Sequence, residues 1–337
     1  MSKKSKDEIY EEVTSKVIES LKAGEIPWES PWIGIGYHRN YVSKKPYRGV
    51  NPMLLSISAS VNGFESLNWL TYKQAAELSV KQWLKSEGLQ DTDENRKLYK
   101  ATDGAYKGVR EGEKSTMITF WKPLLIDDSD NLDSDGRPIK KTIPLLKYIY
   151  VFNGDQTDLE LKEPDNNKDM LDFTPIEAAA EIIDNWEDKP RIIEFKDMPA
   201  CYIPSQDEIN MPSRKQFLTE EYFYKTLYHE CVHATGHKSR LNRVKNWAGF
   251  GTEPYAKEEL IAEIGASMLV SYAGIETEDT ERNTAAYIKN WIKRLEEDPK
   301  LIIGASGKAQ KAVDYIIGIS YEQEVERYDN EKEEVNA

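Results

Sequence analysis

Apolar residues recur at helical spacing in several segments of the chain. From Ile9 to Leu21 they follow one another at steps of four, and Gly24 comes shortly afterwards. This spacing places the apolar side chains on one face of a helix, and glycine is a common stop signal. The pattern predicts an amphipathic helix over residues 7–23. Further helices are expected over residues 175–187, 219–235 and about 254–273.

Apolar runs between polar segments predict strands. Residues 109–125, VREGEKSTMITFWKPLL, have the pattern of a turn followed by a strand, and residues 141–153 have that of a second strand. The polar stretch at 126–141 between them has the composition of a hairpin loop. Short strands are also expected within residues 191–212. Together these elements indicate an α+β fold.

The length of 337 residues suits about two domains. Residues 157–172 are the predicted linker, because this stretch is acidic, contains Pro and Asn, and lacks aromatic residues. We therefore predict an N-terminal domain over residues 1–156, a C-terminal domain over 173–325 and an acidic tail over 326–337. Residues 81–106 are polar with little periodicity, which predicts a surface insertion in the first domain.

Composition narrows the class of protein. Hydrophobic residues make up 39% and charged residues 31%, a balance typical of soluble globular proteins. The two cysteines, Cys201 and Cys231, cannot build a disulfide framework, so we expect a cytoplasmic protein. No apolar run approaches the roughly 18 residues that a membrane span needs, so no membrane partner is expected. No apolar segment follows the basic N-terminus as in a signal peptide.

The net charge of −14 is unevenly distributed along the chain. Basic residues slightly outnumber acidic ones over residues 1–125, whereas acidic residues greatly outnumber basic ones over residues 126–337. An acidic protein can still bind nucleic acid where its basic residues share one face. A nucleic-acid surface is therefore to be sought in the N-terminal third.

A short cluster offers the chemistry of metal ligands. Residues 228–243 read YHECVHATGHKSRLNR and hold three of the four histidines. His229 and His233 are four apart, so a helix places both imidazoles on one face with Glu230 beside them. This is the H-E-x-x-H motif, in which two histidines bind zinc and the glutamate is the general base for the attacking water. The alternative is a pair of helix histidines that bind nothing.

The third ligand is not a histidine of the same cluster. A metzincin would place a histidine at position 239, which is Ser239. His237 lies one turn past His233, but Gly236 is expected to end the helix there, so His237 is predicted to be a turn residue.

Two glutamates on the following helix are the better candidates. Glu259 and Glu263 are four apart among small and apolar residues, and a buried carboxylate without a partner is costly. A divalent metal, Zn²⁺ or another, supplies a partner. We predict that Glu259 is the third ligand and that Glu263 orients a ligand histidine; the reverse assignment is the alternative. Three protein ligands leave one position open for water, which predicts hydrolysis of a peptide bond.

Aromatic and basic residues interleave in the N-terminal third. Rings that stack bases and cations that follow phosphates are what single-stranded nucleic acid requires. The alternative is that the rings are core residues and the cations lie on a solvated face. The residues predicted to contact DNA are Lys44, Lys45, Tyr47, Arg48, Asn51, Trp69 and Lys73.

The chain resembles ArdC-type antirestriction proteins, which also occur as the N-terminal part of some conjugative-plasmid primases. The resemblance covers most of residues 8–275. It rests in the first domain on PWESPW, YRGVNPMLL, WLTYKQA, VREGEKSTMITFWKP and YIYVFNGDQ. It rests in the second on YIPSQDEINMP, YHECVHATGHKSRLNR and YAKEELIAEIGASML.

The resemblance implies an N-terminal domain that binds single-stranded DNA and a C-terminal zincin-like metallopeptidase domain. It implies a protein of plasmids or phages that protects incoming DNA from restriction. His229 and His233 match the metal-binding histidines of the family, Glu230 matches the catalytic glutamate, and Glu259 matches the following carboxylate. The chain departs from the family in the insertion at 81–106, and in Cys231 and Val232 inside the motif.

Two other functions remain as alternatives. The chain could be a metallopeptidase that acts on a protein substrate, with the N-terminal domain serving recruitment. The metal could instead be purely structural, in which case its coordination would be closed.

Overall fold

A computed structural model describes residues 4–28, 38–102, 108–132, 138–162, 175–195, 199–245, 252–275 and 285–319. The predicted acidic tail, most of the predicted linker and the turn of the predicted hairpin lie outside these ranges. Helices and strands are both present, which confirms the predicted α+β fold.

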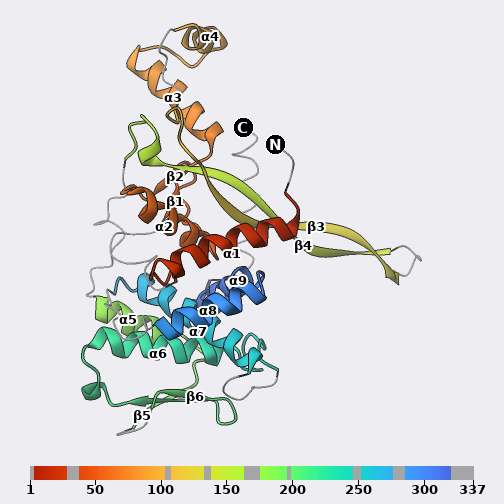
Figure 1. Cartoon of the computed structure of the whole chain (residues 1–337), viewed down its shortest axis with the longest axis vertical. Helices are drawn as coiled ribbons and strands as arrows, with labels where there is room; N and C mark the ends of the chain where they lie inside the picture. Colours follow the sequence, from red (N-terminus) through yellow and green to blue (C-terminus); the bar gives the residue numbers. More distant parts are fainter. Residues whose placement is uncertain are drawn as a thin grey trace.

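The N-terminal half builds a four-stranded sheet with helices around it (Figure 1). Its helices are α1 (Lys6–Lys22), α2 (Asn51–Asn62), α3 (Tyr72–Ser86), α4 (Asp93–Ala101) and the one-turn η1 (Gly154–Gln156). Its strands are β1 (Arg39–Asn40), β2 (Asn68–Leu70), β3 (Thr116–Leu132) and β4 (Pro138–Asn153). The order is β1-β2-β4-β3, with β1 parallel to β2 and the other pairs antiparallel.

The C-terminal half is mostly helical and carries a small sheet. Its helices are α5 (Pro175–Asp184), the one-turn η2 (Arg214–Gln216), α6 (Glu220–Thr235), α7 (Glu253–Tyr272), α8 (Ala285–Glu297) and α9 (Leu301–Ile316). Its strands are β5 (Arg191–Phe195), β6 (Cys201–Ile203) and β7 (Glu208–Pro212). The sheet order β5-β7-β6 leaves β6 at an edge. Cys201 and Cys231 are free thiols.

Two polar segments have more regular structure than the sequence predicted. Within residues 81–102, α3 continues to Ser86 and α4 follows with Thr92 as its N-cap, and the surface insertion at 81–106 stays a prediction. Residues 126–141 are not all loop, because β3 and β4 stay paired in register as far as Asp128 and Ile139. Backbone pairing alone can extend a two-stranded ribbon into polar sequence, and Figure 1 shows this ribbon reaching away from the body.

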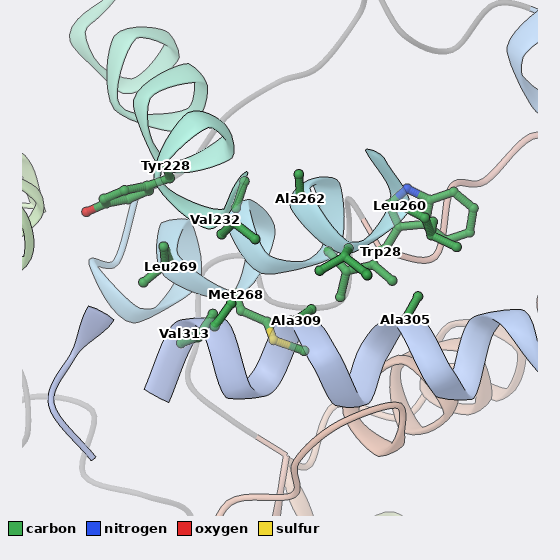
Figure 2. Packing of buried hydrophobic residues seen from close by; sticks show 14 of the residues in the cluster. Trp28, Tyr228, Val232, Leu260, Ala262, Met268, Leu269, Ala305, Ala309 and Val313 are labelled. Carbon is green, nitrogen blue, oxygen red and sulfur yellow. The ribbon is translucent and has the colours of Figure 1, made fainter. Parts of the chain in front are cut away.

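The main hydrophobic core runs through both halves of the chain. It joins α1 residues such as Val13 and Val17 to residues of α6, α7 and α9. Trp28, fully buried, lies beside Leu260 of α7 (Figure 2). Thr14 donates a hydrogen bond from Oγ1 to the carbonyl of Pro299, 2.7 Å away. The two predicted domains therefore share one core, and their boundaries stay a prediction.

Close packing of α6 against α7 sets the geometry of the C-terminal half. Gly265 of α7 faces Val232 of α6, and a Cβ on Gly265 would lie 2.7 Å from Val232 Cγ2. Val232 and Ala262 are both buried in the main core (Figure 2). A β-branched, buried side chain has little freedom to move aside. A larger residue at position 265 would therefore clash with Val232 where α6 and α7 cross.

We expect Gly265→Ala to destabilise the protein relative to Gly304→Ala, a matched control on α9 where an added Cβ meets nothing within 4 Å. Both variants gain helix propensity, about 1 kcal/mol each, so their difference isolates the overpacking cost of about 1–3 kcal/mol. Urea unfolding of the two variants measures it. Equal stabilities would show that α6 and α7 can separate without cost.

Candidate metal centre

Helix α6 carries three of the predicted site residues. Thr219 caps its N-terminus by accepting a hydrogen bond from the Tyr222 backbone N–H, and Glu220 and Glu221 lie in the first turn, where acidic residues are favoured. The helix ends at Thr235, so His229, Glu230 and His233 lie in its last two turns. His237 lies beyond the helix, where its Nδ1 accepts a hydrogen bond from the Ser239 backbone N–H. It is a turn residue, as predicted.

Three donor groups converge between α6 and α7. The Nε2 atoms of His229 and His233 are 3.1 Å apart. Glu259 places Oε1 3.3 Å from His233 Nε2 and Oε2 3.5 Å from His229 Nε2. Ligands about 2.1 Å from a tetrahedral ion lie about 3.4 Å from one another. The three groups therefore already have the spacing that a tetrahedral site requires.

The orientation of His233 is fixed by a residue that the sequence analysis missed. Glu258 Oε1 lies 3.5 Å from His233 Nδ1, on the ring edge opposite the converging Nε2 atoms. Arg243 in turn holds Glu258, with Nη2 2.6 Å from Oε1 and Nε 3.1 Å from Oε2. Both charged side chains are about nine-tenths buried. A carboxylate behind a ligand histidine sets its tautomer and raises its basicity.

Glu263 does not have the position that the sequence predicted. Its Oε2 accepts hydrogen bonds from Trp28 Nε1, 3.1 Å away, and from the Tyr287 hydroxyl. Four residues advance about 6 Å along a helix, which carries Glu263 past the histidine pair. The residue behind the histidine is therefore Glu258, and Glu263 instead links α7 to the N-terminal half.

Glu230 faces the small sheet. Its Oε2 accepts a hydrogen bond from the backbone N–H of Tyr202, 2.7 Å away. Tyr202 is the middle residue of the edge strand β6. The turn after β6 is held by Asp207, which accepts hydrogen bonds from the Tyr202 hydroxyl and from Arg240. The position of Glu230 is therefore tied to the sheet as well as to its own helix.

A cavity of about 660 Å³ opens onto this group of residues. His229 and His233 are 12% and 11% exposed and Glu259 is 24% exposed, so the donor atoms are sheltered but reachable. One wall consists of Ala200, Cys201, Tyr202 and Pro204. The opposite side includes Tyr255, four residues before Glu259 on α7.

Hydrogen bonds and neighbouring charges favour the charged forms of His233 and Glu259. Burial disfavours a charged His233, but hydrogen bonds to Glu258 and Glu259 outweigh it and raise the pKa of His233 to about 10. Burial likewise disfavours a charged Glu259, but hydrogen bonds from His229 and His233 hold its pKa well below its usual range. Because a ligand histidine must be neutral, metal binding at neutral pH has to release the His233 proton.

Two of the residues predicted to contact DNA have structural roles. Trp69 is fully buried, and its Nε1 donates a hydrogen bond to Nδ1 of His38, 3.0 Å away. Asn51 is bonded to the backbone of β3 through Thr119, by Nδ2 at 2.7 Å and Oδ1 at 2.8 Å. The Trp69 ring is closed to a base, which corrects that prediction, whereas Asn51 is half-buried and its contact with DNA stays a prediction. Tyr47 is half-buried and packs beside Trp69, against Leu55 and Ile118.

The other predicted contacts lie nearer the surface. Lys44 is exposed and places Nζ 3.4 Å from the centre of the Tyr41 ring; Lys45 is half-buried. Lys73 is exposed beside Tyr72, whose side chain is 59% exposed. Arg48 is half-buried and makes an ion pair with Asp314 of α9. Tyr72 is the exposed ring of this region that the sequence analysis left out of its final set, whereas Tyr41 is half-buried and packs against the cluster of Leu70, Ala75 and Leu159.

Two family models match successive parts of the chain. A family described as the N-terminal domain of the anti-restriction factor ArdC matches residues 7–152. A family described as zincin-like metallopeptidase matches residues 178–308, which include all the residues of the metal centre.

Similar proteins cover almost the whole chain. Two DNA primases TraC of Escherichia coli are each 33% identical over 94% of this chain, which spans only 20% and 28% of their lengths. The uncharacterized protein y4eC of Sinorhizobium fredii is 30% identical over 92% of this chain and 91% of its own. Crystal structures of the antirestriction ArdC protein of plasmid R388, metal-free and Mn(II)-bound, are 30% identical with a TM-score of 0.64. They cover 91% of this chain and 96% of theirs.

Fold and site together define a protein with an anti-restriction N-terminal domain and a zincin-like metallopeptidase domain. The chain belongs to the ArdC family of antirestriction proteins. This confirms the resemblance drawn from the sequence. No helix in the described ranges is long and apolar enough to cross a membrane.

The position of Glu258 leads to a prediction about metal affinity. We expect Glu258→Gln to weaken Mn²⁺ binding by about 10–100-fold, because the amide is a poorer acceptor for His233. Glu263→Gln is the matched control, since Glu263 contacts Trp28 and Tyr287 instead. Glu259→Ala should lose most of the binding. Isothermal titration of the three variants measures these affinities, and a larger loss with Glu263→Gln would restore the original assignment.

Proposed function

We propose that this protein protects mobile DNA from restriction by binding single-stranded DNA through its N-terminal half, and that it holds a divalent metal in a zincin-like site. The observation that carries the proposal is the set of converging donors His229, His233 and Glu259, in a chain that matches the R388 antirestriction protein over both halves. That relative has been solved with Mn(II), and H-E-x-x-H sites commonly take zinc. Zn²⁺ or Mn²⁺ is therefore the proposed ion.

The roles of the side chains follow from their positions. A divalent ion bound to His229, His233 and Glu259 would polarise a carbonyl and lower the pKa of a bound water. Glu230 adjoins this group and is the proposed base; the Tyr202 N–H holds its carboxylate in place. Burial and a hydrogen bond to Glu259 raise the pKa of Tyr255 to about 12, so its hydroxyl stays protonated and can donate in the cavity.

The proposed DNA surface is the region around β1 and the start of α3. Lys44, Lys45 and Lys73 supply cations, and Tyr72, which is 59% exposed, supplies a ring that a base can stack on. Tyr41 is half-buried and holds the ammonium group of Lys44 over its ring. Arg48 and Tyr47 border this region from half-buried positions. Trp69 packs in the buried cluster next to this region, and Asn51 is hydrogen-bonded to the backbone of β3.

Salt dependence tests DNA binding. We expect a single-stranded oligonucleotide to bind, and log K to fall linearly with log salt concentration. Each of Lys44→Gln, Lys45→Gln and Lys73→Gln should reduce the slope by about 0.7, because each removes one phosphate contact. Lys293→Gln on α8, with a side chain 73% exposed, is the matched control. Absence of binding at low salt would refute this part of the proposal.

The alternative function is a metallopeptidase that acts on a protein substrate, with the N-terminal half serving recruitment. The cavity beside an edge strand favours it, because such strands can pair with an extended peptide. The two functions differ in what they require of Glu230.

Glu230→Gln separates the two functions. If DNA binding is what protects, the variant should bind metal and oligonucleotide as the parent does and should keep protecting transferred DNA from restriction. Conjugation efficiency into a restricting host measures protection, with metal content as the control for an intact site. Loss of protection with metal and DNA binding intact would favour the peptidase.

A further inference from the structure

The cavity of the metal centre is lined by cationic side chains that have no part in the proposed metal binding. Besides the histidines, it is lined by three carboxylates and four cationic side chains. The carboxylates are Glu230, Glu258 and Glu259, and the cations are Arg243, Lys245, Lys257 and Lys308.

Two of the four cations are neutralised by partners of their own. Arg243 is paired with Glu258 through two hydrogen bonds. Lys257 lies 2.9 Å from Glu253 and 3.1 Å from Asp298. The first pair supports His233 through Glu258. The second links α7 to Asp298, which follows α8.

Lys245 and Lys308 have no ion pair among the residues that the structure describes. They come from different parts of the chain, Lys245 from the segment after α6 and Lys308 from α9, yet both line the same cavity. A divalent ion would offset the charges of Glu230 and Glu259. The two lysines would then leave the loaded cavity with a positive charge that nothing in it balances.

The edge strand β6 and its flanks contribute uncharged side chains to the lining of the cavity, namely Ala200, Cys201, Tyr202 and Pro204. An extended peptide bound beside β6 would direct its side chains alternately to the two faces of the sheet. A carboxylate of this peptide that entered the cavity would meet Lys245 and Lys308, which line it and are both exposed to solvent.

We infer that the metal cavity selects polypeptides that present a carboxylate beside the bond held at the metal. The carboxylate is either an Asp or Glu side chain or the free C-terminus of the polypeptide. This inference rests on the proposed zincin-like site and adds the class of its substrate. Lys245 and Lys308 are the residues that determine the preference.

Binding of matched peptides to the full-length Glu230→Gln protein loaded with Mn²⁺ tests the inference, since this background should bind peptides without cleaving them. Three fluorescent peptides of one length are compared by anisotropy: one with internal Glu and an amidated end, one with Gln in its place, and the Gln peptide with a free C-terminus. We expect at least one carboxylate-bearing peptide to bind more tightly than the neutral one.

The lysine variants assign that preference to the cavity. Lys245→Gln and Lys308→Gln should each reduce the preference by about two- to fivefold, the range for solvent-accessible ion pairs. Lys238→Gln, an exposed lysine that does not line the cavity, should leave it unchanged. Whichever carboxylate peptide responds identifies the source of the recognised group.

Several outcomes would overturn the inference: no peptide binding to metal-loaded protein, equal binding of all three peptides, or a preference that both lysine variants keep. Weakened oligonucleotide binding with unchanged peptide binding would assign the two lysines to DNA instead. Metal content and oligonucleotide binding, measured on the same samples, separate this result from failure of the proposed function. If the parent protein binds neither metal nor DNA, the proposed function itself is wrong.

Discussion

The contact between α6 and α7 is the constraint on which the metal centre depends. Two histidines at spacing four supply only two donors, and the third must come from another helix at a fixed distance. Gly265 lets α7 lie directly against Val232, and this approach brings Glu259 within 3.5 Å of both imidazoles. A wider helix separation would move the carboxylate out of the tetrahedral spacing. Steric fit in an apolar layer therefore decides the geometry of a polar site.

The same contact buries charges that would otherwise be unfavourable. Glu258 and Arg243 are both removed from water, and burying one without the other would cost several kcal/mol. Their mutual hydrogen bonds offset much of this cost, and the remaining acceptor capacity of Glu258 is directed at His233. Replacing such a pair with apolar residues is often neutral or stabilising in other proteins. Its presence behind a ligand histidine is therefore better explained by orientation of that ring than by stability.

Site residues that depend on spacing within one helix can be predicted from the sequence. Those that depend on the rotation of one helix against another, or on tertiary packing, cannot. The placement of His229, Glu230 and His233 follows from the period of a helix. The predicted bounds of that helix, 219–235, agree with α6 within about one residue. The choice between Glu258 and Glu263 depends on the rotation of α7 against α6, which spacing along α7 does not reveal. Trp69 is ambiguous for a similar reason, since an aromatic residue beside lysines suits a stacking platform as well as a core. Polar composition also conceals the helix α4, because a capping residue such as Thr92 and a buried residue such as Tyr99 suffice to order a charged helix.

The sharing of one core between the two halves changes how the proposed functions relate. Arg48, beside the proposed DNA surface, is paired with Asp314 of α9, and the Gly49 N–H donates to Gln310 one turn earlier. Trp28 bonds to Glu263, one turn beyond the proposed metal ligand Glu259. A recruiting domain on a free tether would need none of these contacts. The proposed DNA surface and the helices of the metal centre are held in one packed body. A substrate bound by the first half would therefore reach the cavity only from directions that this arrangement leaves open.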